Sequence, residues 1–127
     1  MDTVSIPGAP PPAGHYSPAV RHGGLVYVSG QLPIHPGSAP DPAMPLDEQV
    51  ELALANLQRV LVAAGSDFTH LISVTVYVAD STAWERVNRV YAAVLGSARP
   101  ARAIVPVPAL HHGLAIEVQA IAAIAAD

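Results

Sequence analysis

The C-terminal quarter of this chain is almost free of charge, which restricts the structures that it can form. Between residues 103 and 126 the only charged side chain is Glu117. Alternate residues of a strand point to opposite faces, so the even positions from 116 to 124 form one wholly apolar face. The opposite face carries Glu117, Gln119 and Ile121 and is still too apolar to be left in water. We therefore expect a strand covered by the core on one side and by another subunit on the other.

The N-terminal half is predicted to contain a hairpin, a loop and a helix. Residues 20–28 hold two β-like runs around Gly23-Gly24, a turn typical of hairpins. Residues 33–45 contain five prolines, which indicates a surface loop. The helix that follows is expected to be capped by Asp47 and ended by Gly65. Its apolar residues recur at helical spacing: Val50, Leu54, Leu57 and Leu61.

The C-terminal half is predicted to hold three strands and a second helix. Residues 71–78 alternate as a strand, with one apolar face: Ile72, Val74, Val76 and Val78. A capping box at 82–85 opens the second helix, and Gly96 ends it. The expected buried stripe of that helix is Trp84, Val87, Tyr91 and Val94. The last strands cover residues 102–107 and 114–124. Pro106 and Pro108 predict that the first of these two either lies at an edge of the sheet or ends early.

This order of elements, β-β-α-β-α-β-β, predicts an α+β fold with both helices on one face of a mixed sheet. The 127 residues fit a single domain, 1–127, in which residues 1–13 form an extended arm without a core of its own. With 51% apolar and 13% charged residues, the chain has more apolar surface than a small monomer can hide. An oligomer is therefore expected.

Composition excludes several kinds of chemistry. Without cysteine there are no disulfides, no thiolate catalysis and no sulfur-bound metal. All six basic residues are arginine, so no internal lysine can form a Schiff base. The net charge of −4, with scattered arginines, argues against nucleic acid as a partner. No signal peptide or membrane-spanning run is recognisable, so we expect a cytoplasmic protein without a membrane partner.

Two charged residues in apolar strands are the main candidates for function. Arg102 offers a planar fork suited to a carboxylate, although a salt bridge to Glu117 or to a neighbouring subunit is an equal alternative. Glu117 lies between Ile116 and Val118, where we expect burial to raise its pKa and favour a general-base or water-activating role. The alternative is a carboxylate that is only satisfied by arginine or backbone donors.

Other candidate positions carry weaker signals. Tyr16 precedes the first strand of the hairpin, and Ser29 and Gly30 end the second, where a glycine lets a ligand approach the backbone. Asn88 in the second helix either binds a ligand or bonds locally. The adjacent histidines His111 and His112 would point to opposite faces if they were in a strand, and no acid lies nearby to complete a set of ligands. We expect a solvated loop pair before Gly113 and no metal site.

Five ordered motifs resemble the RidA (YjgF-type) family of reactive-intermediate deaminases, also called liver perchloric-acid-soluble proteins. The resemblance covers nearly the whole chain. It is carried by Gly14-His-Tyr-Ser-Pro-Ala-Val20, Val28-Ser-Gly-Gln31, Thr75-Val-Tyr-Val-Ala-Asp80, Val87-Asn-Arg-Val-Tyr91 and Pro100-Ala-Arg102. Glu117, fifteen residues after Arg102, falls where the family keeps its catalytic glutamate.

The resemblance implies a chorismate-mutase-like fold and a homotrimer with ligand sites between subunits. It also implies a cofactor-independent hydrolase that converts enamines or imines such as 2-aminoacrylate and 2-iminobutyrate to 2-keto acids and ammonia. Arg102 would hold the substrate carboxylate and Glu117 would activate water or relay a proton. The implied pocket residues are Tyr16, Ser29, Gly30, Asn88 and Ile104.

Three alternatives to this activity remain open at the level of sequence. The chain could be a trimeric carboxylate-binding or chaperone-like module without turnover. It could be a divergent relative that acts on another imine in a specific pathway. The ribonuclease activity attributed to some relatives is the third, and the acidic, lysine-free composition counts against it.

Overall fold

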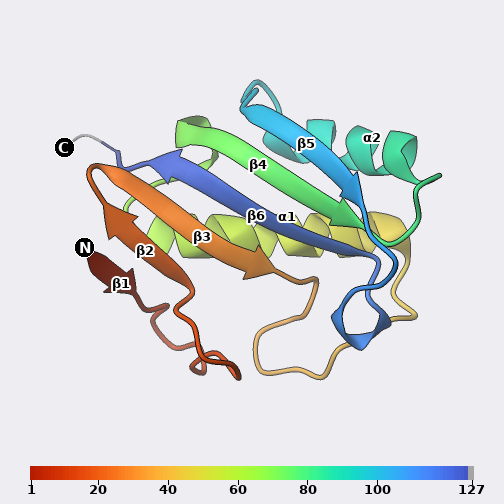
Figure 1. Ribbon diagram of the computed structural model, residues 1–127, viewed down its shortest axis with the longest axis horizontal. Coiled ribbons are helices and arrows are strands. Elements are labelled where there is room, and N and C mark those ends of the chain that lie inside the picture. Colours follow the sequence, from red (N-terminus) through yellow and green to blue (C-terminus); the bar gives the residue numbers. More distant parts are fainter. Residues whose placement is uncertain (126–127) are drawn as a thin grey trace.

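Two helices cover one face of a six-stranded sheet (Figure 1). The computed structural model describes residues 1–125 of the chain. The strands are β1 (Asp2–Val4), β2 (Ala19–His22), β3 (Leu25–Gln31), β4 (Leu71–Val78), β5 (Ala101–Pro106) and β6 (Ile116–Ala123). The helices are α1 (Leu46–Ala63) and α2 (Trp84–Leu95), with short 3₁₀ turns at Phe68–His70 and His111–Gly113. The predicted α+β fold is confirmed, with one strand more than expected.

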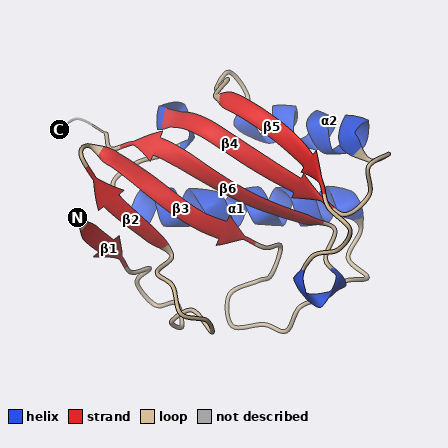
Figure 2. Ribbon diagram, viewed as in Figure 1, coloured by secondary structure: helices blue, strands red, loops and turns tan. Residues whose placement is uncertain are grey.

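The strand order is β1-β2-β3-β6-β4-β5, so the C-terminal strand lies in the middle of the sheet (Figure 2). All neighbouring pairs are antiparallel except β4 and β5, which run parallel. A parallel pair needs a crossover connection, and α2 supplies it between these two strands. β5 is an edge strand, as its prolines predicted, because Pro106 has no N–H to donate to a further neighbour.

The core lies between the sheet and the helices. Every second residue of the central strands is buried against α1 and α2, as the apolar alternation predicted. The buried residues of β4 and β6 are Val74, Val76, Val78, Ile116, Val118, Ala120 and Ala122. From α1, the fully buried Leu54, Leu57 and Leu61 complete this layer, each stabilising the fold by about 1.5–3 kcal/mol on burial.

Glycines form the hairpin turn and end the first helix, as predicted. Gly23 and Gly24 have φ values of 60° and 79°, which a two-residue hairpin turn requires. Gly65, with φ of 85°, follows α1 in a Schellman motif. There its N–H donates to the carbonyl of Val62, and the N–H of Ser66 donates to that of Leu61.

Both helix starts differ from the prediction, and the arm carries a short strand. Residues 2–4 of the arm form β1 and bury Val4 in the core of the domain. Asp47 lies inside the first turn of α1 and binds Arg86 of α2 at 2.7 Å instead of capping its own helix. The capping box is also wrong, because the Thr82 hydroxyl donates to Asp80 in the preceding turn.

Two apolar residues that we expected in the core are exposed. Ile72 lies at a register shift in β4, so it leaves the buried face and is 45% exposed. Trp84 begins α2 and is 51% exposed, while Leu95 takes a buried place in that helix. The last strand is shorter than predicted, since Leu114 and Ala115 precede it.

The face of the sheet opposite the helices carries no covering layer from residues 1–125 (Figure 1). Tyr27 of β3 is 42% exposed there, and Ile121 of β6 is only partly buried. Among the described residues, neither helix is long and apolar enough to cross a bilayer.

Candidate functional site

Arg102 lies on β5 and points toward α2. It is in register with Val74 of β4, whose side chain is buried on the helix-covered face. The Arg102 Nη1 donates to Asn88 Oδ1 at 2.6 Å, and its Cζ lies 4.9 Å from the centre of the Tyr91 ring. The hydrogen bond and the cation–π contact together fix the orientation of the guanidinium. Among residues 1–125, Arg102 takes part in no salt bridge, so the fork keeps its charge available.

The Tyr91 ring stacks on the Arg102 guanidinium, and Tyr91 was not predicted as a site residue. Its ring is 7% exposed, and its Oη has no hydrogen-bond partner in the described part of the chain. Burial raises the pKa of Tyr91, and the nearby positive charge of Arg102 opposes that rise. The sequence did contain a signal, because Asn88 and Tyr91 are three residues apart and share one face of α2.

A cavity of about 450 Å³ opens beside Arg102, between α2 and β5. Its walls include Asn88, Tyr91, Arg99, Pro100 and Arg102. We call Asn88, Tyr91 and Arg102 the Arg102 cluster. Two arginines and no acidic side chain line this cavity, so it favours an anionic group.

Glu117 lies on β6 and points away from the helices. Its register partner on β4 is Tyr77, three residues from Val74 and therefore on the opposite face of the sheet. The neighbours Ile116 and Val118 point into the core, so they do not bury the carboxylate as the sequence had suggested. Within residues 1–125, Glu117 forms no salt bridge.

A β-bulge places Gly30 against Glu117. Val28 pairs with Ala120 and Gln31 with Val118, so Ser29 and Gly30 together stand opposite one residue of β6. A Cβ built on Gly30 would lie 2.6 Å from Glu117 Oε2. The missing side chain at this position makes room for the carboxylate.

Ser29 connects the end of β3 to the segment that carries Tyr16. The Ser29 hydroxyl donates to the Ser17 carbonyl at 2.6 Å, and its N–H donates to the Pro18 carbonyl at 3.0 Å. These bonds tie the segment that carries Tyr16 to the end of β3. Tyr16 itself is 56% exposed and lines a cavity together with Gly30. We call Tyr16, Ser29, Gly30 and Glu117 the Glu117 cluster.

One chain does not bring Arg102 and Glu117 into one crevice. They lie on opposite faces of the sheet, with β4 between β5 and β6. The predicted alternative of a salt bridge between these two residues within the chain is therefore wrong. Asn88 lies with Arg102, and Gly30 lies against Glu117. Ser29 precedes Gly30 in the bulge, and Tyr16 shares with Gly30 a cavity that Glu117 does not line. Ile104 is in register with the buried Val76, and its partly buried side chain packs on the core while its backbone lies on the edge strand.

The two adjacent histidines lie in an exposed 3₁₀ turn. Their ring centres are 6.2 Å apart, and His112 has a φ of 61°, so the pair lies outside the strands, as its loop position before Gly113 predicted. In the part of the chain that the structure describes, no group of three or more histidine and acidic residues is placed to hold a metal ion.

The fold and the two clusters define the class of protein: a small α+β domain with an arginine and a carboxylate, unpaired among residues 1–125, on opposite faces of one sheet. Residues 7–124 match the Endoribonuclease L-PSP family, and the chain belongs to this family, the RidA or YjgF-type family that its motifs predicted.

Several relatives are similar over almost their full length. The 2-iminobutanoate/2-iminopropanoate deaminase of Bos taurus is 40% identical over 94% of this chain and 87% of its own. A RutC family protein of Pyrococcus horikoshii is 35% identical over 95% of this chain and 96% of its own. RidA from an Antarctic Psychrobacter has a TM-score of 0.88 at 32% identity, covering 98% of this chain and 100% of that one. Escherichia coli TdcF with bound serine has a TM-score of 0.86 at 30% identity, covering 97% and 98%.

Proposed function

We propose that this protein hydrolyses small carboxylate-bearing imines and enamines, of the 2-iminobutanoate and 2-aminoacrylate type, to 2-keto acids and ammonia. The observation that carries the proposal is the Arg102 guanidinium, oriented by Asn88 and Tyr91 and without an acidic partner among the described residues. Such a fork binds a carboxylate with two parallel hydrogen bonds. The deaminase names of relatives up to 40% identical supply the substrate class.

The proposed chemistry needs an acid–base group as well as a carboxylate clamp. Water adds to the imine carbon, and the resulting carbinolamine expels ammonia and leaves the keto acid. Glu117 is the proposed base that takes a proton from water and then passes it to the leaving nitrogen. An enamine first gains a proton at carbon to give the imine, and the same carboxyl group can deliver that proton. The reaction needs no cofactor.

We further propose that Arg102 and Glu117 of different subunits form each site in a homotrimer. Their placement on opposite faces of one sheet supports this, because only a second copy can bring the missing group to either cluster. The apolar face around Tyr27 and Ile121 offers the contact surface. The Arg102 cluster lies at the edge strand β5, where it is accessible to a neighbouring subunit.

The test generates 2-aminoacrylate or 2-iminobutanoate in situ with an auxiliary amino-acid dehydratase and measures keto-acid release. Wild type is expected to exceed the spontaneous rate, while Arg102→Ala and Glu117→Ala lose most of that acceleration. Hydrolysis no faster than the spontaneous rate would exclude this substrate class.

The second candidate is a trimeric module that binds small carboxylates without turnover. This candidate is favoured by the similar protein TdcF, which was solved with serine bound. Titration calorimetry with serine or a stable 2-keto acid separates the candidates: binding that depends on Arg102 without any acceleration of imine hydrolysis would favour the module.

A further inference from the structure

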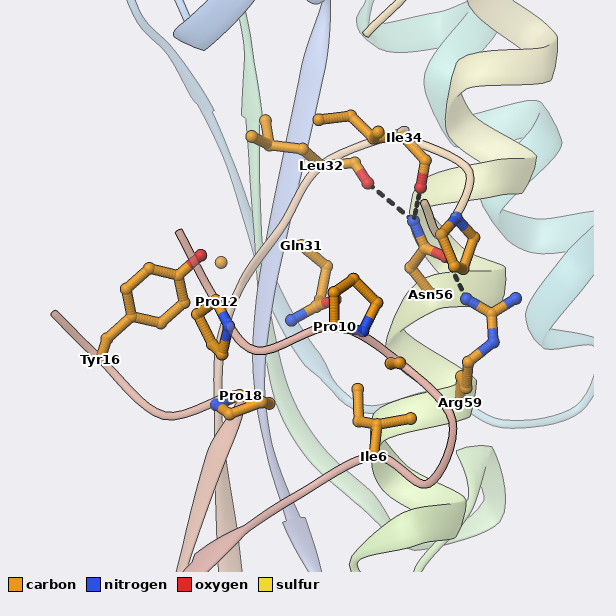
Figure 3. A pocket seen from close by; sticks show the side chains of 13 residues that line it. Ile6, Pro10, Pro12, Tyr16, Pro18, Gln31, Leu32, Ile34, Asn56 and Arg59 are labelled. Carbon is orange, nitrogen blue, oxygen red and sulfur yellow. Dashed lines mark hydrogen bonds between the residues drawn. The ribbon is translucent and has the colours of Figure 1, made fainter. Parts of the chain in front are cut away.

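A second cavity, of about 230 Å³, lies between the N-terminal arm, the segment after β3 and helix α1 (Figure 3). It shares Tyr16 and Gly30 with the Glu117 cluster, but neither Glu117 nor Arg102 lines it. In Figure 3, Tyr16 stands at one end and the α1 residues Asn56 and Arg59 at the other. The proposed deamination makes no use of this α1 end.

The polar end of this cavity is held rigidly. Asn56 is 7% exposed, and its Nδ2 donates to the carbonyls of Leu32 at 2.8 Å and Ile34 at 2.9 Å. These two bonds use both amide protons, so the orientation of the side chain is fixed with Oδ1 toward Arg59. Arg59 Nη1 donates to that oxygen at 2.6 Å from the next turn of the helix.

The Arg59 guanidinium is positioned but not neutralised. Apart from the bond to Asn56, it donates no hydrogen bond to the described residues and forms no salt bridge with them. Its Nε and Nη2 protons therefore remain for a ligand. A guanidinium held at a cavity mouth without a counter-charge attracts an anion.

The remaining walls are mainly apolar and stiff. Ile6, Pro10 and Pro12 come from the arm, and Ile34 and Pro36 come from the segment after β3. Proline has no N–H and a fixed φ, so these walls are preformed and offer no backbone donor at those positions. They suit an alkyl or aryl group.

We propose that this cavity is a binding site for a monocarboxylate with a compact apolar body. Arg59 binds the carboxylate, and the proline and isoleucine walls enclose the apolar part. A phosphate dianion fits less well, because one guanidinium leaves a charge uncompensated beside apolar walls. A neutral apolar molecule fits less well too, because it would cover the guanidinium without pairing it.

The test is titration calorimetry of the full-length protein with 3-phenylpropanoate and with the neutral 3-phenylpropanamide. Arg59→Gln is expected to weaken binding of the acid about tenfold to hundredfold, the usual effect of losing a hydrogen bond to a charged group. The amide is expected to bind wild type more weakly than the acid. Arg89→Gln removes the same charge from an exposed position on α2 and is expected to leave binding unchanged.

Two further variants separate this site from the proposed catalytic one. In an Arg102→Ala background, which removes the proposed carboxylate clamp of the catalytic site, 3-phenylpropanoate is expected still to bind and Arg59→Gln still to weaken that binding. Ala9→Phe, which fills the cavity and keeps Arg59, is expected to abolish binding at this cavity. Equal affinity of wild type and Arg59→Gln would overturn the proposal. So would loss of binding in Arg102→Ala, or absence of saturable binding by wild type. None of these outcomes depends on imine hydrolysis, which is measured separately.

Discussion

Glu117 rests against the backbone of Gly30, which leaves no room for a side chain at residue 30. A Cβ there would lie 2.6 Å from Oε2 and 2.9 Å from Cδ of the carboxylate. Gly30 is not among the glycines with positive φ, so the backbone angles alone do not demand glycine. The requirement for glycine is steric, because the Glu117 carboxyl group occupies the space beside the bulge where a side chain of residue 30 would lie.

Gly30→Ala should therefore impair the site more than the fold. The new methyl group displaces the carboxylate, and we expect kcat/KM for imine hydrolysis to fall at least about tenfold, since small misplacements of reacting groups are costly. The free energy of unfolding should fall by only about 1 kcal/mol or less, because Gly30 is exposed. In a Glu117→Gln background the same substitution should cost almost no further activity. An equal loss in both backgrounds would contradict the assignment.

Arg102→Lys tests the geometry of the clamp separately from its charge. Lysine keeps the positive charge but loses the fork and much of the stacking on Tyr91. We expect kcat/KM to fall about tenfold to hundredfold with the fold intact, as judged by circular dichroism. Arg89→Lys is the matched control on the exposed face of α2. Full activity of Arg102→Lys would show that only charge matters.

Mixing two inactive variants tests whether a site spans two subunits. If Arg102 and Glu117 come from different chains, co-expressed Arg102→Ala and Glu117→Gln subunits create some interfaces with both native residues. Random mixing in equal amounts is expected to restore about a quarter of wild-type activity in a cyclic homotrimer. Each variant alone keeps only its small residual activity. No recovery in verified mixed oligomers would place both groups in one chain, against their positions on opposite faces.

The order of the elements was predictable because apolar spacing changes clearly between strand and helix along this chain. The even-numbered residues of β6 are buried as the alternation required, and Gly65 ends α1. Strand pairing was not predictable in the same way. The bulge at Ser29-Gly30 and the shift at Ile72 depend on the partner strand, and local sequence does not specify that partner.

The candidate residues were visible in the sequence, but their grouping was not. Arg102 and Glu117 are conspicuous as lone charges in apolar strands. Which sheet face each one takes depends on the register of β4 with β5 and β6, which no local pattern contains. The helix caps failed for a related reason: Asp47 and Thr82 are good capping residues, but Arg86 and Asp80 compete for their side chains.

Asp67 provides an acid-sensitive contact within the short 3₁₀ turn between α1 and β4. Hydrogen bonds from Thr69, and then from His70, lower the pKa of Asp67 below its ordinary value of 3.8. The folded state thus favours the charged form, so its contribution is present above pH 3.8 and is lost as the pH falls through the folded pKa. Asp67→Asn keeps an acceptor oxygen but cannot titrate. Its melting temperature should lie below that of wild type at neutral pH, and the difference should shrink in acid. A constant difference would exclude this carboxylate as the cause.

Tyr91→Phe tests the buried hydroxyl of the ring that stacks on Arg102. The Oη is buried and has no hydrogen-bond partner among residues 1–125, so its removal should leave the free energy of unfolding unchanged or raise it by about 1 kcal/mol. The phenyl ring still stacks on the guanidinium, and imine hydrolysis should persist.

Tyr91→Leu is the matched comparison, because it removes the ring as well and should lower kcat/KM. Since burial raises the pKa of Tyr91, the folded state favours the neutral phenol. Wild type should therefore lose stability relative to Tyr91→Phe as the pH rises above the ordinary tyrosine value of 10.0. Urea unfolding at neutral and at alkaline pH measures this difference. A Phe variant that is less stable than wild type at neutral pH would mean that the hydroxyl has a partner in the assembled protein.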